Sequence, residues 1–320
     1  MSGNPVTFLE SSFLSPLLNI EGVTDISYNG KDLFYVSNEK GRQRAGIEAK
    51  KEDVSSFLRQ LANLTEHQFS VQSPILNISF GRYRMNAVNS SLARRKNEKA
   101  FTFSLRLESS DCKITSKSSF FDKKSLQILN QLIKKGESII IGGKVSSGKT
   151  ELQKWLLQNM APCTRVIVID DVEELDMVEN ENIDLTTWLV SEQGKGASFS
   201  DLIKNALRND PDYIVIAEAR GEEMLDALVS AMSGHPIITT VHAENLNAMP
   251  DRVARLAMTG NKRLFKDELM GDISRHLRYY VYVEKEIAKN GSIKRYVKAI
   301  GHLDETSKKM SVIYERGKES

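Results

Sequence analysis

One stretch of the chain combines the residue types and the spacing of a phosphate-binding loop. Residues 143–150, GKVSSGKT, fit the pattern G-x-x-x-x-G-K-[ST]. Glycines let backbone N–H groups curl around anionic oxygens, Lys149 supplies a mobile positive charge, and the Thr150 hydroxyl can ligate Mg²⁺. Lys144 and Val145 stand where smaller residues are more common. The residues expected to bind phosphate are Gly143, Ser146, Ser147, Gly148, Lys149 and Thr150.

Polar side chains follow three further apolar runs at the point where each run ends. Asp171 and Glu174 come after RVIVI, Glu218 and Arg220 after YIVIA, and His242 after IITTV. Taken singly, such residues are ordinary turn carboxylates or surface histidines. Because ligands of an open α/β sheet bind outside the carboxyl ends of its strands, their joint position instead favours one site beside the loop.

Hydrolysis of a nucleotide requires a positioned Mg²⁺, a carboxylate that orients water and donors for the developing charge. Glu218 is the candidate for orienting water, with Arg220 as a neighbouring catalytic candidate. Asp171 and Glu174 would hold Mg²⁺ through its water shell, since Mg²⁺ usually keeps several waters. His242 could donate a hydrogen bond to the terminal phosphate.

The elements that must position these groups alternate between strand and helix. A short apolar run, 138–141, leads into the loop, and 151–160 has the apolar spacing of a helix. Alternation continues to residue 243, which predicts a mostly parallel sheet with helices on both faces. The last three runs, YYVYVE, SIKRYVKAI and MSVIYE, are spaced like an antiparallel meander.

The first third of the chain predicts a separate α+β domain. A hairpin is expected around 23–36, a helix over 52–64 and alternating strands between 75 and 107. The tip Arg94-Arg95-Lys96 is expected to be a solvated loop. We place the N-terminal domain at 1–115, a linker at 116–124 and the second domain at 125–320.

Composition narrows the class of protein. At 320 residues, the chain is long enough for two domains with cores of their own. A net charge of +2 argues against a dedicated nucleic-acid binder, so no direct nucleic-acid binding is expected. Two cysteines are too few for a disulfide framework or a tetra-cysteine zinc site. With no apolar run of membrane-spanning length and no visible secretory signal, a cytoplasmic protein is expected.

The motifs together resemble the hexameric secretion ATPases, also called traffic ATPases, of type II and type IV secretion systems and related pili. Four segments carry the resemblance in order: GGKVSSGKT (Walker A), IDDVEEL (Asp box), LRNDPDYIVIAEARGEE (Walker B) and SGHPIITTVHAEN (His box). SEQGKGASFSDLIKNALRNDPD and VTDISYNGKDLFYV resemble the branch that serves type IV secretion, conjugation and tight-adherence pili.

This resemblance implies a fold and a set of partners. The fold is α/β, with an N-terminal α+β sensor-like domain followed by a RecA-like P-loop ATPase domain. ATP and Mg²⁺ are the implied cofactors. A homo-hexamer at the inner face of the cytoplasmic membrane, bound to membrane-embedded apparatus subunits, is the implied assembly. The resemblance also adds residues to the nucleotide site: His235 from the His box, and Arg82, Arg84 and Arg106 from the N-terminal domain.

Departures from the family pattern leave alternatives open. Asp170 stands where the family commonly has Glu, Ala217 replaces a usual Gly, and Pro236-Ile237 replaces a Gly-containing pair. An ATP-hydrolysing motor of a type IV secretion or conjugation machine is the first hypothesis. A tight-adherence or type IV pilus assembly ATPase and a nucleotide-gated scaffold with weak turnover are the alternatives. A DNA-translocating motor is disfavoured by the balanced charge.

Overall fold

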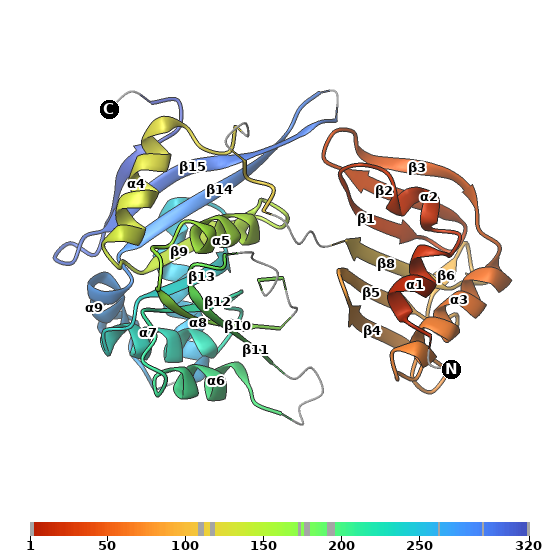
Figure 1. Cartoon of the computed structure of the whole chain (residues 1–320), viewed down its shortest axis with the longest axis horizontal. Coiled ribbons are helices and arrows are strands. Elements are labelled where there is room, and N and C mark those ends of the chain that lie inside the picture. Colours follow the sequence, from red (N-terminus) through yellow and green to blue (C-terminus); the bar gives the residue numbers. More distant parts are fainter. Residues whose placement is uncertain are drawn as a thin grey trace. The chain divides into compact units, whose positions relative to one another are not determined.

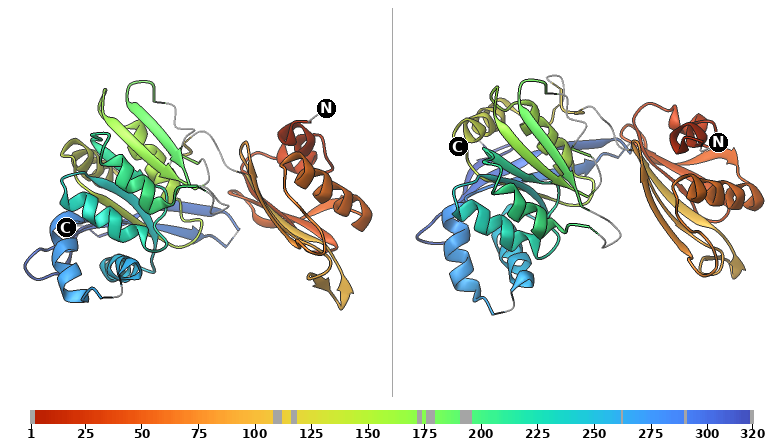
Figure 2. Two further views of the ribbon diagram at one scale, coloured as in Figure 1. Left: turned by 90° about the horizontal axis from the view of Figure 1, so that it is seen from below. Right: turned by 60° about the horizontal axis from the view of Figure 1, so that its bottom comes forward.

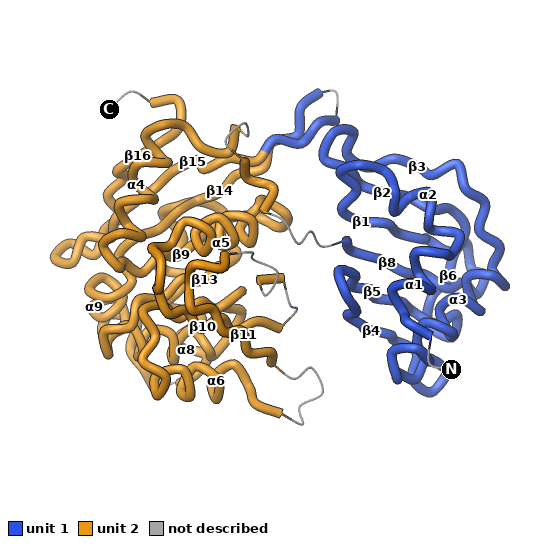
Figure 3. Tube along the Cα trace, in the orientation of Figure 1, with its two compact units in different colours: residues 1–109, 287–294 blue, residues 110–286, 295–320 orange. Residues whose placement is uncertain are grey.

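The computed structural model describes residues 3–107, 112–115, 119–171, 174–175, 180–190, 196–261, 263–289 and 291–318. The chain forms two compact units (Figure 3). Unit 1 consists of Met1–Ser109 and Ile287–Lys294, and unit 2 of Ser110–Glu286 and Arg295–Ser320. A segment from near the C-terminus thus belongs to unit 1, which the order of motifs in the sequence did not indicate. Within unit 1, the Ile293 N–H donates to the Asn38 carbonyl at 2.9 Å.

Unit 1 is a six-stranded sheet with strand order β3-β2-β1-β8-β5-β4, in which neighbouring strands are antiparallel (Figure 1). Its helices bury an apolar face against one side of the sheet, as Val54, Phe57 and Leu58 of the longest helix show. The elements are α1 (Pro5–Glu10), α2 (Ser15–Leu18), β1 (Val23–Tyr28), β2 (Asp32–Ser37), β3 (Gly41–Glu48), α3 (Lys51–Leu64), β4 (Ile75–Phe80), β5 (Tyr83–Val88), β8 (Thr102–Leu107) and the small hairpin β6 (Arg94–Arg95) and β7 (Glu98–Lys99).

Unit 2 contains an eight-stranded sheet with strand order β11-β10-β12-β13-β9-β14-β15-β16. The six strands from β11 to β14 are parallel, and β15 and β16 are antiparallel to each other. The strands are β9 (Ile139–Gly143), β10 (Arg165–Asp170), β11 (Asp184–Leu189), β12 (Tyr213–Ile216), β13 (Ile237–His242), β14 (Tyr279–Ile287), β15 (Ile293–Leu303) and β16 (Met310–Glu315).

Two strands of this sheet have features that the sequence did not indicate. β14, β15 and β16 are successive neighbours, as the expected meander requires, but β14 also joins the parallel part beside β9, because its run Tyr280–Val283 is buried on both faces as an interior strand requires. β11 was not anticipated, since its side chains are only partly buried and include the two threonines of DLTTWL. It forms the edge of the sheet, where one neighbour is enough.

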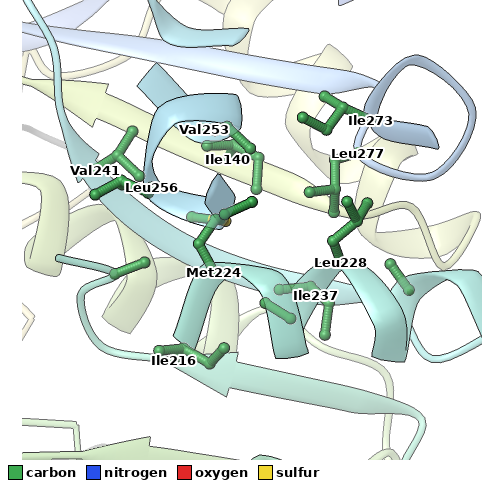
Figure 4. Packing of buried hydrophobic residues seen from close by; sticks show 14 of the residues in the cluster. Ile140, Ile216, Met224, Leu228, Ile237, Val241, Val253, Leu256, Ile273 and Leu277 are labelled. Carbon is green, nitrogen blue, oxygen red and sulfur yellow. The ribbon is translucent and has the colours of Figure 1, made fainter. Parts of the chain in front are cut away.

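Helices cover both faces of the unit 2 sheet (Figure 2). α4 (Lys123–Lys134) and α5 (Lys149–Gln158) pack on one face, and α6 (Phe199–Ala206), α7 (Glu223–Met232), α8 (Met249–Gly260) and α9 (Lys266–His276) on the other, with a short 3-10 turn η1 (Leu246–Ala248) before α8. Figure 4 shows Met224 and Val253 of this second layer meeting Ile140 and Ile216 of the sheet. Among the described residues, no helix has the length and apolar composition to cross a membrane.

The start of α4 gives a test of this packing. Asp122 caps the helix by accepting the Ser125 N–H at 2.8 Å, and its other oxygen accepts the Tyr314 hydroxyl at 2.5 Å. Asp122→Ala should lower the free energy of unfolding by about 1–2 kcal/mol. Urea denaturation followed by fluorescence reports on unit 2, because both tryptophans, Trp155 and Trp188, lie there. The exposed neighbour Lys123→Ala is the control, and equal stability of the two variants would contradict the expectation.

Candidate functional site

The phosphate loop connects the end of β9 to the start of α5. Gly148, with φ +100°, turns the backbone into the helix, and Lys149 and Thr150 are its first two residues. The Ser147 N–H donates to the Lys144 carbonyl at 3.3 Å and closes the loop. Backbone N–H groups at a helix N-terminus form a binding site for anions. The strand, loop and helix expected from the sequence are therefore present in this order.

The interior of the loop is tightly built around Gly143. A Cβ at this position would contact the Ser147 hydroxyl and lie 2.6 Å from the Val283 carbonyl oxygen, so no side chain fits. The Ser147 Oγ is buried and, among the described residues, has no hydrogen-bond partner. Burying a hydroxyl without a partner costs free energy, which an anionic oxygen in the loop would recover. The loop therefore fits a bound phosphate.

The strand register gathers four of the expected side chains at one edge of the sheet. His242 at the end of β13 lies opposite Gly143 at the end of β9. The Lys149 ammonium lies 3.3 Å from His242 Nδ1, and His242 Nε2 lies 2.8 Å from Glu218 Oε1, although the latter pair lacks the angle of a hydrogen bond. Asp171 follows β10 and reaches the same group through Arg220.

Arg220 holds the two carboxylates together. Its Nε and one terminal nitrogen donate to Glu218 Oε2 at 3.1 and 3.0 Å, and the other donates to Asp171 Oδ2 at 2.6 Å. Burial opposes the charge of Arg220, but Asp171 and Glu218 outweigh it and raise the pKa of the guanidinium. Without this cation, two neighbouring carboxylates would repel each other.

Asp171 keeps one carboxylate oxygen that could take part in holding Mg²⁺. Asp171 Oδ1 and Glu218 Oε1 are both buried and accept no hydrogen bond from the residues that the structure describes, but Glu218 Oε1 lies 2.8 Å from His242 Nε2. Carboxylate oxygens and bound water are the ligands that Mg²⁺ prefers. Thr150, partly buried at the start of α5, would add its hydroxyl. Glu174 is partly buried three residues beyond Asp171, whereas Asp170 is fully buried and its Oδ2 accepts the Leu175 N–H at 3.1 Å.

His242 is held in its neutral form. Burial, and after it the charge of Lys149, lower the pKa of the imidazole, and Glu218 opposes this shift only in part. A lysine ammonium can only donate hydrogen bonds, so Nδ1 is the acceptor of the Lys149 contact. The Lys149 ammonium also lies 3.5 and 3.4 Å from the carbonyl oxygens of Gly143 and Lys144.

His235 is not brought to this group. His235 precedes β13, whereas His242 is the last residue of the same strand, so the two histidines lie at opposite ends of β13. His235 Nδ1 lies 3.2 Å from the Pro211 carbonyl oxygen. The residue lines a cavity of about 900 Å³ together with Cys163 and Tyr213. An extended strand of six residues spans about 20 Å, which separates His235 from the phosphate loop.

The three arginines expected at the nucleotide lie in unit 1 and divide into two groups. Arg84 of β5 and Arg106 of β8 are direct cross-strand neighbours on the face of the sheet away from the helices, and Arg106 Nε lies 3.3 Å from Asp25 Oδ1. Arg82 belongs to the turn before β5, and its Nε donates to the Tyr83 hydroxyl at 3.0 Å. The structure thus gathers Arg84 and Arg106 and places Arg82 apart.

Two buried polar residues that the sequence analysis missed hold the backbone of the Glu218 segment. The Gln153 amide of α5 donates to the Ile216 carbonyl at 3.0 Å, and the Thr240 hydroxyl of β13 donates to the Ala217 carbonyl at 2.9 Å. Each links a neighbouring element to the strand end that carries Glu218. The available signal was a polar residue directly beside apolar ones, since Gln153 follows Leu152 on the buried side of its helix.

Comparisons with known proteins identify a matching family and several similar sequences. The model of the family described as "Type II/IV secretion system protein" matches residues 95–281. An uncharacterised protein of Bacillus anthracis is 26% identical over 295 residues, which cover 89% of this chain and 65% of that protein. The type IV secretion system protein VirB11 of Bartonella quintana is 32% identical over 158 residues, covering 48% of this chain and 44% of that protein. The chain thus spans less than two thirds of the length of the Bacillus anthracis relative.

A solved structure supports the fold over nearly the whole chain. The X-ray structure of the Legionella pneumophila ATPase DotB has a TM-score of 0.67 and 18% sequence identity, and the match covers 96% of this chain and 83% of that chain. The expected fold class, an N-terminal α+β domain followed by a RecA-like domain, is confirmed.

The close packing at Gly143 predicts the effect of a single methyl group. Gly143→Ala should weaken binding of Mg-ADP by at least about tenfold, because the new Cβ displaces Ser147 or the Val283 backbone from the loop. Isothermal titration calorimetry measures this change. Gly234→Ala, where a Cβ meets nothing within 4 Å but φ is +94°, controls for the general cost of replacing a glycine. Equal nucleotide affinity in Gly143→Ala and the wild type would show that the loop does not form the phosphate site.

Proposed function

We propose, since this chain belongs to the Type II/IV secretion system protein family, that it is an ATP-hydrolysing motor of a type IV secretion or conjugation machine. One observation carries the proposal. A continuous series of contacts runs from Lys149 in the phosphate loop through His242 and Glu218 to Arg220 and Asp171, and all five residues lie at the carboxyl edge of one sheet.

Each of these groups has a role in hydrolysis. Lys149 and the loop N–H groups bind the phosphates, and Thr150 with Asp171 and Glu174 would hold Mg²⁺ through its water shell, which neutralises charge on the phosphate oxygens. Glu218 orients the attacking water. Arg220 holds Glu218 and Asp171 side by side and offsets the repulsion between them, as its three hydrogen bonds support.

His242 connects nucleotide binding to the water-orienting carboxylate. In the contacts described, the Lys149 ammonium is shared between two loop carbonyls and His242 Nδ1. A terminal phosphate attracts this ammonium more strongly than neutral acceptors do. His242 then loses its donor at Nδ1 and can turn toward the phosphate while it remains beside Glu218.

The assembly proposed for this motor follows the family. Six copies form a ring at the cytoplasmic face of the membrane and bind membrane-embedded subunits of the apparatus. The family resemblance implies an interdomain cleft that closes when nucleotide attracts Arg84 and Arg106 of the N-terminal unit and opens after hydrolysis. The paired placement of Arg84 and Arg106 on one sheet face supports their joint action.

A nucleotide-gated scaffold is the second candidate, and the unusual loop residues motivate it. Val145 is 64% exposed in the phosphate loop, and Ala217 precedes Glu218. The motor requires repeated turnover, whereas the scaffold requires binding and release only. Single-turnover and multiple-turnover measurements of ATP hydrolysis with purified protein separate the motor from the scaffold. A tight-adherence pilus ATPase would give the same result as the motor in these measurements.

Substitution of the carboxylate tests the proposed chemistry directly. Glu218→Gln should lower kcat by about a hundredfold or more while ATP still binds, because the amide cannot act on the water as a carboxylate does. Lys149→Ala should lose nucleotide binding itself. Phosphate release measures the first effect and calorimetry the second. The exposed Glu222→Gln makes the same change nearby and should match the wild type. A wild-type rate no higher than that of Glu218→Gln would refute the motor.

The lowered pKa of His242 predicts the pH dependence. Because neutral imidazole is the form that accepts from Lys149, kcat should be constant above about pH 7 and fall only below the ordinary histidine pKa of 6.5, where protonation makes His242 repel the ammonium. His242→Asn keeps an acceptor near the Nδ1 position without a titrating group, so the fall at acid pH should be absent in that variant. A wild-type midpoint well above 6.5, or the same acid profile in His242→Asn, would contradict this role.

A further inference from the structure

The middle of the phosphate loop has a backbone conformation that costs free energy. Ser146 has φ +58°, in the left-handed region that residues with a Cβ seldom adopt. Such conformations persist when the surrounding structure holds them in place, and they are frequent at ligand sites. Ser146 is followed by Ser147, whose N–H faces the Lys144 carbonyl across the loop at 3.3 Å.

Arg295, at the start of β15, contacts the loop at two points. Its Nε donates to the Ser146 carbonyl oxygen at 2.8 Å. Its stem covers Gly148, since a Cβ built there would lie 3.4 Å from the Arg295 Cδ and 3.2 Å from the Phe120 ring. One side chain thus bonds the residue with the strained backbone and packs on the glycine that starts the helix.

The position of Arg295 is fixed by the strand that carries it. Two residues further along β15, the Val297 N–H donates to the Phe120 carbonyl at 2.9 Å. Phe120 is buried, and the adjacent Phe121 packs on Trp155 of α5, with ring centroids 4.6 Å apart. The strand and the helix that follows the loop are therefore tied to the same segment, and Arg295 meets the loop from a rigid support.

We propose that Arg295 is a positioning residue of the nucleotide site, which holds the phosphate loop in its binding conformation through the Ser146 carbonyl. A trans peptide directs its C=O and N–H to opposite sides. With the Ser146 carbonyl bonded to Arg295, the Ser147 N–H of the same peptide must face the other side, where it donates to the Lys144 carbonyl and where a phosphate oxygen would replace that acceptor. This inference rests on the proposed function, because it requires that the loop binds nucleotide.

Two cations, Lys149 and Arg295, contact different carbonyl oxygens of the phosphate loop. Lys149 approaches the carbonyls of Gly143 and Lys144 from the interior, where a nucleotide would displace it. Arg295 binds the carbonyl of Ser146 from the strand side, where no phosphate need displace it. Its hydrogen bond can therefore persist in the nucleotide-bound loop. A guanidinium stays ionised at every relevant pH, so the contact is charge-assisted.

Two neutral variants of similar size separate the hydrogen bond from the stem. Arg295→Gln places its Nε2 donor as many bonds from the backbone as the Nε of arginine, whereas Arg295→Met has a methyl group at that point. Calorimetric titration with Mg-ADP should show about tenfold weaker binding for Arg295→Met, the usual effect of losing a charge-assisted hydrogen bond. Arg295→Gln should stay within about threefold of the wild type. This rescue by a donor is not expected of a residue that only fills space.

Lys294→Met is the matched control, because it removes the same charge from the exposed neighbouring residue and should bind Mg-ADP like the wild type. If Arg295→Met fails to fold, Arg295→Lys replaces it: lysine keeps the charge but moves the donor one bond further, and it should bind more weakly than Arg295→Gln. Wild-type affinity in Arg295→Met, or an equal loss in Arg295→Met and Arg295→Gln, would overturn the proposal.

The wild-type protein distinguishes this inference from the proposed function. Tight Mg-ADP binding without ATP hydrolysis would end the motor hypothesis and leave the role of Arg295 intact. ATP hydrolysis by the wild type, together with unchanged Mg-ADP affinity in Arg295→Met, would support the motor hypothesis and overturn the role of Arg295.

Discussion

Two carboxylates lie next to each other at the ends of two strands, and Arg220 is the cation that offsets their repulsion. Its hydrogen bonds to Glu218 and Asp171 tie the ends of β12 and β10 together. The oxygen of each carboxylate that faces away from Arg220 remains buried without a hydrogen bond among the described residues. One side chain therefore offsets the repulsion and engages only one oxygen of each carboxylate. The rest of the sheet serves to bring these strand ends level with Gly143.

Sequence reasoning located the residues whose position depends on a strand end. Glu218, Asp171 and His242 each follow a buried apolar run, and parallel pairing necessarily places such ends at one edge. It misplaced His235 relative to the loop, because membership in one motif says nothing about which end of a strand a residue occupies. The family resemblance grouped Arg82 with Arg84 and Arg106, but Arg82 lies in the turn before β5 rather than on a strand.

Other features depend on contacts between segments far apart in the chain, which a pattern in one segment cannot encode. Gln153 and Thr240 are recognisable as supports of Glu218 only when α5 and β13 are seen beside β12. The same holds for Arg295, an ordinary strand residue by sequence that meets a loop far upstream in the chain. Side-chain donors that bond backbone carbonyls of distant segments are thus the part of this site that periodicity and spacing do not predict.

The return of residues 287–294 to unit 1 bears on how the protein folds as the ribosome makes it. The strands of the N-terminal sheet emerge early, whereas the segment whose Ile293 N–H meets the Asn38 carbonyl emerges only after most of unit 2 has been translated. At bacterial and eukaryotic elongation rates, this delay is about 10 to 40 s. The contact between the Asn38 turn and Ile293 can therefore form only after that interval, so the N-terminal unit is completed after the bulk of unit 2 has been translated.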